Sequence, residues 1–337
     1  MTVLIVGVDG GGSKTHAVAL TIDGELAGRG DGPGSSPHFS GVQQSIEVVD
    51  AAVRAAIAAA SAEPASVTQA NVYVSGIDLP PEIGAYADAA AALPWTSRST
   101  VVDNDLFALL RTGTEAPDAV AVVCGTGINA IGVRSAAGGE PAATARFAAL
   151  GPISGDWGGG SGLGEEALWH AARAEDGRGP ATALHAAVLA GMGVATIAEL
   201  TQDIHFGRRT VADLSVLAPS VFVVANAGDE IAVRIVERQA GEVVAFARAS
   251  LARLGMLDRE VPVVLGGGVI RGGDERLISA IAAGLATDAP LARIVRVDAP
   301  PIVGAGLLAL ESAGASAAAL DRARHELTAA YEKAGTR

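Results

Sequence analysis

The hydrophobic pattern of the first thirty residues predicts three short strands joined by two hairpins. Residues 3–6 form a continuous apolar run, a glycine-rich stretch follows, and residues 16–22 then alternate between the two faces of a strand. Asp23-Gly24 turns the chain into a third strand at residues 25–27, because this dipeptide favours a tight hairpin turn.

A helix with one buried face follows a Gly/Pro/Ser loop at residues 32–37. Its apolar side chains recur every three or four positions, at Val42, Ile46, Val49, Val53 and Ile57. The later elements of this region are a strand at 72–74, a helix near 81–92, a strand at 100–102 and a short helix from about Leu106. The predicted order is therefore βββαβαβα.

The same opening pattern recurs after a turn-rich segment at residues 112–118. A strand at 119–124 leads through a Gly-Thr-Gly turn into a second strand at 128–133, so this half also starts with a glycine hairpin. Residues 161–254 are mainly helical by periodicity, and Gly228-Asp229 marks the start of the last long helix. Only the opening of the unit is recognisable as an internal repeat.

The final part of the chain returns to alternating strands and helices. It contains a strand at 261–265, a strand near 294–295, a helix at 302–310 and an Ala- and charge-rich helix from 317. A chain of 337 residues is too long for one ordinary compact core and suits two lobes. We therefore expect an α/β protein with lobes at 1–113 and 114–301, the second carrying a helical insertion, and C-terminal helices at 302–337. The first of these helices is expected to pack back toward the N-terminal lobe.

Composition and charge narrow the classes of protein further. Hydrophobic residues make up 50% of the chain but aromatic residues only 4%, which favours α/β layers over an aromatic-rich β-sandwich. The 37 acidic residues outnumber the 24 basic ones and no Lys/Arg cluster interrupts them, so nucleic acid and anionic membranes are poor partners.

The compartment follows from the cysteine content and the start of the chain. Cys124 is the single cysteine and cannot form an intrachain disulfide, and the chain opens directly into a strand without a cleavable leader. Apolar runs are broken by glycine or charge well short of a membrane span. We expect a cytoplasmic protein, and a homodimer is left open.

The first glycine run is the strongest chemical signal, and it does not fit the two best-known phosphate loops. It reads Gly7-Val8-Asp9-Gly10-Gly11-Gly12-Ser13-Lys14-Thr15. A Walker A loop needs Gly-Lys-Ser/Thr, but Ser13 separates Gly12 from Lys14, and the next segment is a strand where a Rossmann motif needs a helix.

A hairpin that binds an anion remains as the functional interpretation of this run. The backbone amides of Gly11 and Gly12 would approach a phosphate closely, and Ser13, Lys14 and Thr15 would add donors. Asp9, at the end of the strand, would hold a hydrated Mg²⁺ against those phosphates. The alternative is a tight turn that merely requires glycine.

A second glycine hairpin, Gly125-Thr126-Gly127, opens the second half. Two such hairpins facing each other would grip a triphosphate from both sides, which makes two coincidental turns a weaker explanation. Gly266, Gly267 and Gly268 follow a strand and offer a third place for close approach, suited to a nucleoside, although an ordinary βα turn also uses glycine.

Asp103-Asn104-Asp105 lies at the carboxyl end of a strand, where open α/β sheets place residues that face ligands. One carboxylate there would accept the proton of an attacking hydroxyl in phosphoryl transfer. Helix capping by Asp or Asn is the alternative.

The glycine-dense segment at residues 151–160 carries Asp156 and Trp157. These would offer a carboxylate to sugar hydroxyls and an indole face to a sugar ring, whereas the alternative is a flexible linker. The histidines show neither metal-ligand spacing nor a hydrolase triad, so we expect no such role for His16, His38, His170, His185, His205 and His325.

Taken together, these motifs resemble the N-acetylglucosamine kinase group of the BadF/BadG/BcrA/BcrD-type ATPases, a branch of the superfamily shared by actin, hexokinases and heat-shock chaperones. The resemblance runs over nearly the whole chain. Its anchors are the first glycine run, Asn104-Asp105, Gly125-Thr126-Gly127-Ile128-Asn129, Gly151-Pro152, Gly155-Asp156, Gly266-Gly267-Gly268 and Gly304-Ala305-Gly306.

The resemblance implies two ribonuclease-H-like lobes of the actin-like ATPase type, with ATP and a sugar in the cleft between them and phosphorylation of the sugar 6-hydroxyl. By position, Asp105 resembles the catalytic base and Asp9 the carboxylate that organises Mg²⁺. The glycines and donors at 11–15 and 125–127 resemble the phosphate hairpins. Asn129 and Asp156 resemble sugar contacts, and Gly267 and Gly268 part of the adenosine site.

Two positions depart from the family pattern, and both are on the sugar side. Ser36 stands where these kinases often carry an Asn, and Trp157 stands where they usually carry a Glu. We expect an ATP- and Mg²⁺-dependent kinase acting on N-acetylglucosamine or glucosamine, with Ser36, Asp105, Asn129, Asp156 and Trp157 at the sugar.

Three alternatives stay open. The acceptor would be another hexose or a muramic-type sugar; the protein would be an ATPase that activates a partner; or it would be a sugar sensor without catalysis. Activators of this kind bind an iron–sulfur cluster through several cysteines, and Cys124 alone is too few. We also expect no DNA-binding regulator, because no helix-turn-helix pattern precedes Val3 in this sequence.

Overall fold

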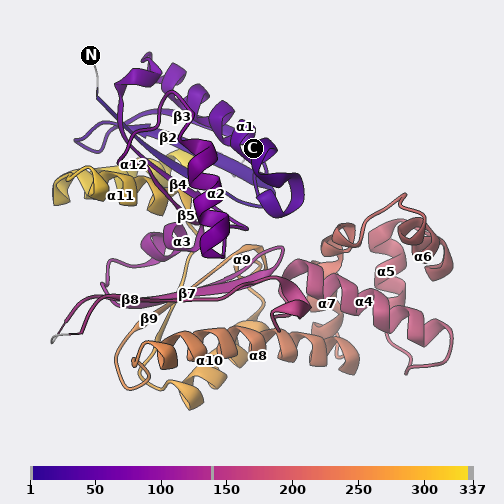
Figure 1. The fold of residues 1–337 in the computed structure, drawn as a ribbon. Helices are drawn as coiled ribbons and strands as arrows, with labels where there is room; N and C mark the ends of the chain where they lie inside the picture. Colours follow the sequence, from indigo (N-terminus) through magenta and orange to yellow (C-terminus); the bar gives the residue numbers. More distant parts are fainter. Residues whose placement is uncertain (1–2, 138–139, 333–337) are drawn as a thin grey trace. The chain divides into compact units, whose positions relative to one another are not determined.

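The computed structural model describes residues 3–137 and 140–332, and the chain divides into two units (Figure 1). The first unit combines Met1–Ala116 with Val297–Arg337, and the second comprises Pro117–Arg296. Each unit contains one five-stranded sheet.

The sheet of the first unit has the strand order β3-β2-β1-β4-β5. β1 pairs antiparallel with β2 and parallel with β4, so the sheet is mixed. Its strands are β1 (Leu4–Gly10), β2 (Lys14–Leu20), β3 (Leu26–Pro33), β4 (Val67–Val74) and β5 (Val101–Asn104).

Helices cover both faces of this sheet because its central strands bury alternate side chains on opposite sides. On β1, Val6 and Val8 pack in the core that contains α1, whereas Ile5 packs with α11 and α12. The helices of the unit are α1 (Pro37–Ala59), the 3₁₀ turn η1 (Pro64–Ser66), α2 (Pro80–Ala90), α3 (Leu106–Gly113), α11 (Ile302–Ser312) and α12 (Ala317–Glu332).

Glycines allow α11 to lie directly against this sheet and against α3. A Cβ atom at Gly7 would come within 2.8 Å of the Gly306 backbone, and one at Gly304 within 1.9 Å of the Ala108 carbonyl oxygen. Real Cβ atoms do not approach that closely, so these positions require glycine for packing.

The second sheet repeats the topology of the first, with the order β10-β9-β6-β7-β8. β6 to β10 take the places of β1 to β5, and the pairing directions match. The strands are β6 (Ala119–Cys124), β7 (Ile128–Arg134), β8 (Ala143–Arg146), β9 (Pro262–Gly266) and β10 (Arg293–Arg296). The repeat seen in the sequence only as a glycine hairpin therefore extends over the whole sheet.

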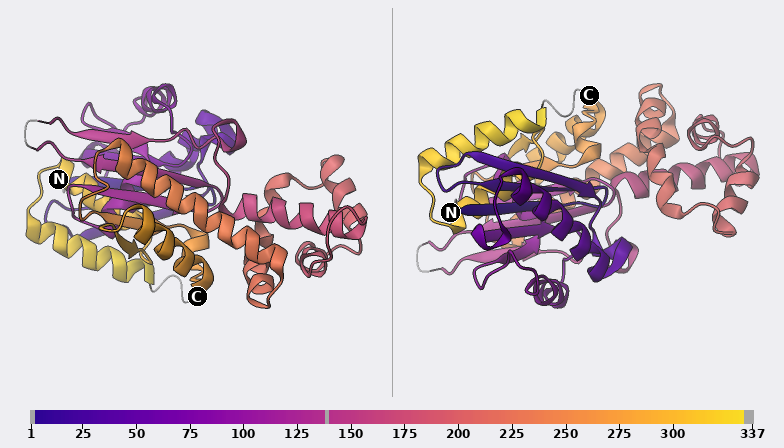
Figure 2. Two further views of the ribbon diagram at one scale, coloured as in Figure 1. Left: turned by 90° about the horizontal axis from the view of Figure 1, so that it is seen from below. Right: turned by 90° about the horizontal axis from the view of Figure 1, so that it is seen from above.

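The helical insertion lies between β8 and β9. Within this unit α8 runs along β6 and β7 together with α10, and helices α4 to α7 gather around the other end of α8 (Figures 1 and 2). The elements of the insertion are η2 (Gly151–Ile153), α4 (Gly159–Glu175), α5 (Leu184–Met192), α6 (Ile197–His205), η3 (Val211–Leu217), α7 (Ala218–Asn226) and α8 (Glu230–Arg253). The helices α9 (Gly268–Arg271) and α10 (Glu275–Asp288) follow β9.

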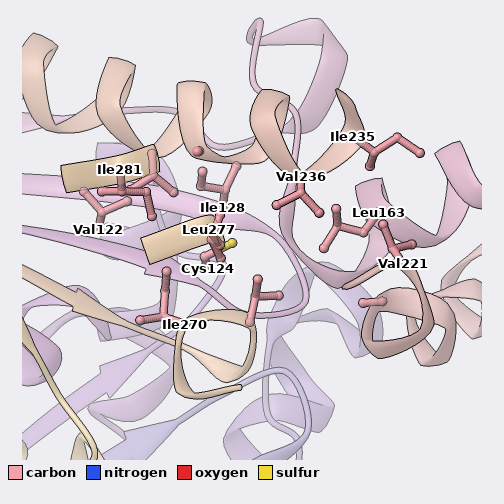
Figure 3. Packing of buried hydrophobic residues seen from close by; sticks show 14 of the residues in the cluster. Val122, Cys124, Ile128, Leu163, Val221, Ile235, Val236, Ile270, Leu277 and Ile281 are labelled. Atoms are coloured by element: carbon pink, nitrogen blue, oxygen red, sulfur yellow. The ribbon is translucent and has the colours of Figure 1, made fainter. Parts of the chain in front are cut away.

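One aliphatic core joins this sheet to the insertion. Figure 3 shows Cys124 beside Ile128 and Leu277, with Leu163 and Val236 continuing the cluster toward α4. Asp229 begins α8 by accepting hydrogen bonds from the backbone N–H groups of Ile231 and Ala232, as its position after Gly228 predicts.

Within residues 3–137 and 140–332, no single helix is both long and apolar enough to span a membrane. Two bent helix pairs meet both criteria when each pair is taken together. The two mixed sheets flanked by helices confirm the predicted α/β fold class.

Candidate active site

The first glycine run forms the β1–β2 hairpin, as predicted. The Gly11 N–H donates to the Lys14 carbonyl oxygen at 2.8 Å and closes the turn. Gly12, Ser13 and Lys14 are exposed at its tip. Their amides and side-chain donors are therefore accessible from solvent.

Thr15 differs from its neighbours because its side chain is fully buried. Its hydroxyl donates to the Pro33 carbonyl oxygen at 2.6 Å and lies 2.8 Å from the Ser35 hydroxyl. The Thr15 side chain therefore ties the hairpin to the loop before α1, and the predicted phosphate donors with accessible side chains are Ser13 and Lys14.

Acidic side chains gather where the parallel strands of the first sheet end. Asp9 lies near the end of β1, Asp78 follows β4, and Asp105 follows β5. Asp9 is 8% exposed and Asp78 6% exposed. Carboxyl ends of neighbouring parallel strands meet at one edge of the sheet, which brings these three carboxylates to the same side.

In the turn between β5 and α3, the side chain that caps the helix is that of Asn104 and not that of Asp105. Asn104 accepts a hydrogen bond from the Leu106 N–H at 3.0 Å, and its amide nitrogen donates to Asp78 Oδ1 at 2.8 Å. Asp105 occupies the N-cap position of α3, but its side chain lacks a capping hydrogen bond of normal geometry. The capping interpretation therefore fits Asn104 better than Asp105.

The Asp105 carboxyl group has a pKa of about 7, well above its usual value of 3.8. Burial is the larger cause, since desolvation disfavours the charged form, and the nearby Asp9 carboxylate is the second. The backbone N–H groups of Asp105 and Leu106 oppose the rise. A carboxyl group with a pKa near neutrality can both accept and release a proton at physiological pH.

The second glycine hairpin joins β6 to β7 in the second unit, where the N-terminus of α4 packs on it. The Gly125 N–H donates to the Gly127 carbonyl oxygen at 2.9 Å. The Gly125 and Thr126 carbonyl oxygens accept the N–H groups of Gly160 and Ser161 at 2.8 and 2.9 Å. The hairpin carbonyls are thus bound by the protein, while Thr126 and Gly127 are exposed.

Packing within the protein does not explain the glycines of this hairpin. A Cβ atom at Gly125 or Gly127 would have no described atom within 4 Å, and neither residue has a positive φ. If these glycines were needed only for a tight turn, we would expect either a positive φ or close packing around their Cβ positions. Neither packing nor a positive φ therefore accounts for the glycines at these two positions.

Gly267 and Gly268 begin α9 beside the end of β6. Gly267 has a φ of +96°, and a Cβ there would lie 2.3 Å from the Cys124 carbonyl oxygen, so this glycine is required by packing. A Cβ at the exposed Gly268 would meet no described atom within 4 Å. Of the pair, only Gly268 has open space at its Cβ position.

The glycine-dense segment is ordered by Asp156, which rules out a flexible linker. One carboxylate oxygen of Asp156 accepts the Gly151 N–H at 2.9 Å, and the other accepts the Ser154 hydroxyl. Trp157 is partly buried, and the Arg238 guanidinium lies 3.8 Å from the centre of its ring. That cation–π contact covers one indole face.

The two remaining predicted sugar contacts lie in different units. Ser36 is 4% exposed before α1, where its carbonyl oxygen accepts the Phe39 N–H at 3.1 Å. Asn129 is 9% exposed on β7 and accepts the Ala130 N–H at 2.7 Å. The first unit therefore holds Asp9, residues 11–15, Ser36 and Asp105, and the second holds the other predicted site residues.

Asp78 is the residue that sequence reasoning missed. Its signal was its position just after the predicted strand at 72–74, the place that singled out Asp105 after the next strand. The two Pro residues at positions 80 and 81 drew the interpretation toward a helix start instead.

A sequence profile decides the family. The profile of the BadF/BadG/BcrA/BcrD ATPase family matches residues 6–309, most of the chain. The chain belongs to this family. The resemblance expected from the glycine hairpins, Asn104-Asp105 and Asp156 is confirmed.

Two proteins with assigned activities are similar to this chain over most of their length. The chain is 27% identical over 323 residues to an N-acetyl-D-glucosamine kinase of Dictyostelium discoideum, covering 92% of this chain and 98% of the relative. It is 26% identical over 270 residues to an N-acetylmuramic acid/N-acetylglucosamine kinase of Clostridium acetobutylicum, covering 79% of this chain and 85% of the relative.

Among solved structures, the fold is similar to that of a provisionally assigned N-acetylglucosamine kinase from Chromobacterium violaceum. The TM-score is 0.70 at 24% identity, and the match covers 92% of this chain and 100% of the other. At this identity the likeness shows a shared fold and nothing more.

Proposed function

We propose that this protein is an ATP-dependent kinase for an amino sugar, transferring the γ-phosphate to the 6-hydroxyl of N-acetylglucosamine or glucosamine. The observation that carries the proposal is Asp105, a carboxyl group with a pKa of about 7 beside Asp9 at the carboxyl edge of the first sheet. The activities assigned to the two relatives support a sugar as the phosphate acceptor.

Asp105 is the proposed general base. Its carboxylate accepts the proton of the sugar hydroxyl while the hydroxyl oxygen forms a bond to the γ-phosphorus. The bond from that phosphorus to the β–γ bridging oxygen breaks, and ADP leaves. Burial of Asp105 raises its basicity and therefore strengthens this step.

Each glycine hairpin is proposed to bind phosphate through its backbone amides, aided in the first hairpin by the exposed Ser13 and Lys14 side chains. Asp9 fits the role of a Mg²⁺-organising carboxylate, since it offers hard oxygen donors at the edge of the sheet beside Asp105. When bound, Mg²⁺ would neutralise phosphate charge.

An activator that passes electrons through an iron–sulfur cluster fits this chain poorly. Cys124 is the last residue of β6 and is fully buried in the aliphatic core (Figure 3), and burial raises the pKa of its thiol to about 12. A cluster needs accessible thiolates. The cysteine of this chain is therefore a core side chain.

The test is a coupled assay for ADP release with Mg-ATP over a panel of N-acetylglucosamine, glucosamine, N-acetylmuramic acid, N-acetylmannosamine and glucose. We expect one of the two named amino sugars to give the highest kcat/KM, with the 6-phosphate as product by mass spectrometry and NMR. A preference for glucose or N-acetylmuramic acid would replace the proposed acceptor. ADP release that no sugar raises above background would overturn the kinase proposal.

A further inference from the structure

Three potential metal ligands lie together in the first unit, beside the carboxyl edge of the sheet. They are His38 from the first turn of α1, Asp78 from the loop after β4, and Glu82 from the first turn of α2. One ligand atom from each lies within 4.8 Å of the other two. The residues are far apart in the sequence, which is why histidine spacing did not reveal them.

The protein holds all three side chains in place. Glu82 Oε2 accepts the N–H groups of Asp78 and Leu79, each at 2.9 Å, and this leaves Glu82 Oε1 facing His38 Nε2 at 3.5 Å. Asp78 Oδ1 accepts from Asn104 at 2.8 Å. A site that is already ordered loses little side-chain entropy when it binds a ligand.

The backbone also makes room for the imidazole. Gly76 has a φ of +76°, and a Cβ atom there would lie 3.0 Å from the His38 ring and 2.6 Å from the Ser36 hydroxyl. Gly41, with a φ of +77°, interrupts α1 and separates the turn that carries His38 from the rest of the helix. Both glycines therefore determine where the His38 ring lies.

Charge at the cluster favours a cation. Two carboxylates contribute two negative charges, whereas the N-terminus of α2 contributes only about half a positive charge. Asp78 is 6% exposed, so its interaction with a nearby charge is screened less than at the surface. Placing a divalent cation between the two carboxylates relieves their repulsion.

We propose that His38, Asp78 and Glu82 form a divalent-cation site, separate from the Mg²⁺ site assigned to Asp9 and selective for transition metals such as Zn²⁺, Co²⁺ or Mn²⁺. One imidazole nitrogen and two carboxylate oxygens suit these ions. Mg²⁺ and Ca²⁺ prefer oxygen ligands alone. Water would complete the coordination, since His38 and Glu82 are partly open to solvent at 33% and 31% side-chain exposure.

The position of the site links it to the reaction centre. Asp78 holds Asn104, and Asn104 caps α3 directly beside Asp105. A cation bound to Asp78 would therefore be connected to the turn that carries the proposed base by one side chain, that of Asn104.

The test is direct titration of the full-length protein, with any affinity tag removed and with nucleotide and Mg²⁺ absent. Isothermal titration with Zn²⁺ and the visible absorption of bound Co²⁺ report binding without requiring activity. We expect one ion per chain and a rise in Tm with ion concentration. His38→Ala removes one of the three ligands, a side chain that is one-third exposed, and should weaken binding at least about tenfold, no less than the loss of an outer-shell partner of a metal ligand does.

His185→Ala is the matched control, because His185 also lies beside a carboxylate, with Nε2 2.9 Å from Glu175 Oε2, but does not belong to the three-ligand cluster. The affinity of the His185→Ala variant for Zn²⁺ should equal that of the wild type. Glu82→Gln gives a second ligand variant, checked for folding by circular dichroism. Absence of stoichiometric binding to the wild type, or equal affinity in wild type and His38→Ala, would overturn the site.

Discussion

At the scale of the residue, the burial of Asp105 and the nearby Asp9 carboxylate support the proposed role of Asp105 as the general base. Asp105→Asn keeps the shape of the side chain but removes the carboxylate that accepts the proton, so kcat should fall by about 10²–10⁴-fold. ATP affinity should change little because the phosphates are assigned to the hairpins. Steady-state kinetics and calorimetric titration of ATP measure the two effects separately.

Asp103→Asn is the control for that change, because Asp103 lies two residues away and accepts the Asn104 N–H at 2.7 Å. Its kcat should remain within about tenfold of the wild type, since it loses a turn contact and not the base. Near-normal turnover of Asp105→Asn would remove Asp105 from the mechanism.

The raised pKa of Asp105 also predicts how stability depends on pH. The folded protein binds the Asp105 proton up to about pH 7, whereas an unfolded chain releases it near 3.8. Stability from this group is therefore present at low pH and is lost as pH rises toward 7. Because the Asp105 residue remains partly accessible to solvent, Asp105→Asn should be more stable than the wild type at pH 8 by only on the order of 1–2 kcal/mol.

Thermal unfolding at pH 5 and pH 8, with EDTA present so that bound cations do not contribute, measures this difference. The gain in Tm from Asp105→Asn should be a few degrees at pH 8 and smaller at pH 5. An equal gain at both values would show that Asp105 does not titrate between them.

At the residue scale, the sequence indicates where a side chain lies along a strand or turn, but it does not show which distant residue that side chain contacts. Asp9 and Asp105 were singled out because Asp9 lies near the end of one strand and Asp105 directly follows another. The hydrogen bond from Thr15 to Pro33 and the cation–π contact of Arg238 with Trp157 join segments that are distant in the sequence, so the sequence did not predict them. The cluster of His38 with Asp78 is hidden from sequence for the same reason.

The β6–β7 hairpin gives a prediction at the scale of an element. Gly125→Ala places a methyl group where no described atom lies within 4 Å and φ is not positive. Stability should be unchanged or rise by about 0.4–1 kcal/mol, because alanine reduces the freedom of the unfolded chain. The KM for ATP should rise at least about tenfold if phosphates approach this backbone.

Gly267→Ala is the contrasting variant, since its φ is +96° and its Cβ would lie 2.3 Å from the Cys124 carbonyl oxygen. It should lose about 1–3 kcal/mol of stability. Thermal unfolding and the KM for ATP, measured on both proteins, separate a ligand-binding glycine from a packing glycine. An unaltered KM in Gly125→Ala would favour the ordinary turn.

Long elements with a clear period were predicted well, and short ones were not. The helix at α1 follows from five apolar residues at helical spacing, and β6 follows from an unbroken apolar run. β8 was not predicted, because its four residues, Ala143–Arg146, bury only Ala145 and show too short an alternation. Its presence follows from pairing with β7, which completes the second sheet.

At the scale of the whole chain, the repeated sheet topology suggests that each unit behaves as a separate folding body, although the first is made from both ends of the sequence. Gly304→Ala tests this. A Cβ there would lie 1.9 Å from the Ala108 carbonyl oxygen and 2.6 Å from the Thr112 hydroxyl, so α11 must move away from α3.

We expect Gly304→Ala to lose about 1–3 kcal/mol of stability through this overpacking. Hydrogen exchange should rise in β1, α3 and α11 together, because both ends of the chain share one core, while β6 and β9 keep their protection. Gly241→Ala, where a Cβ on α8 meets no described atom within 4 Å, is the control and should leave exchange unchanged or slower throughout. Faster exchange in β6 and β9 of Gly304→Ala would instead show that the two units unfold as one. The core that contains β6 and β9 includes no residue of α11, so a local change at α11 would not otherwise affect it.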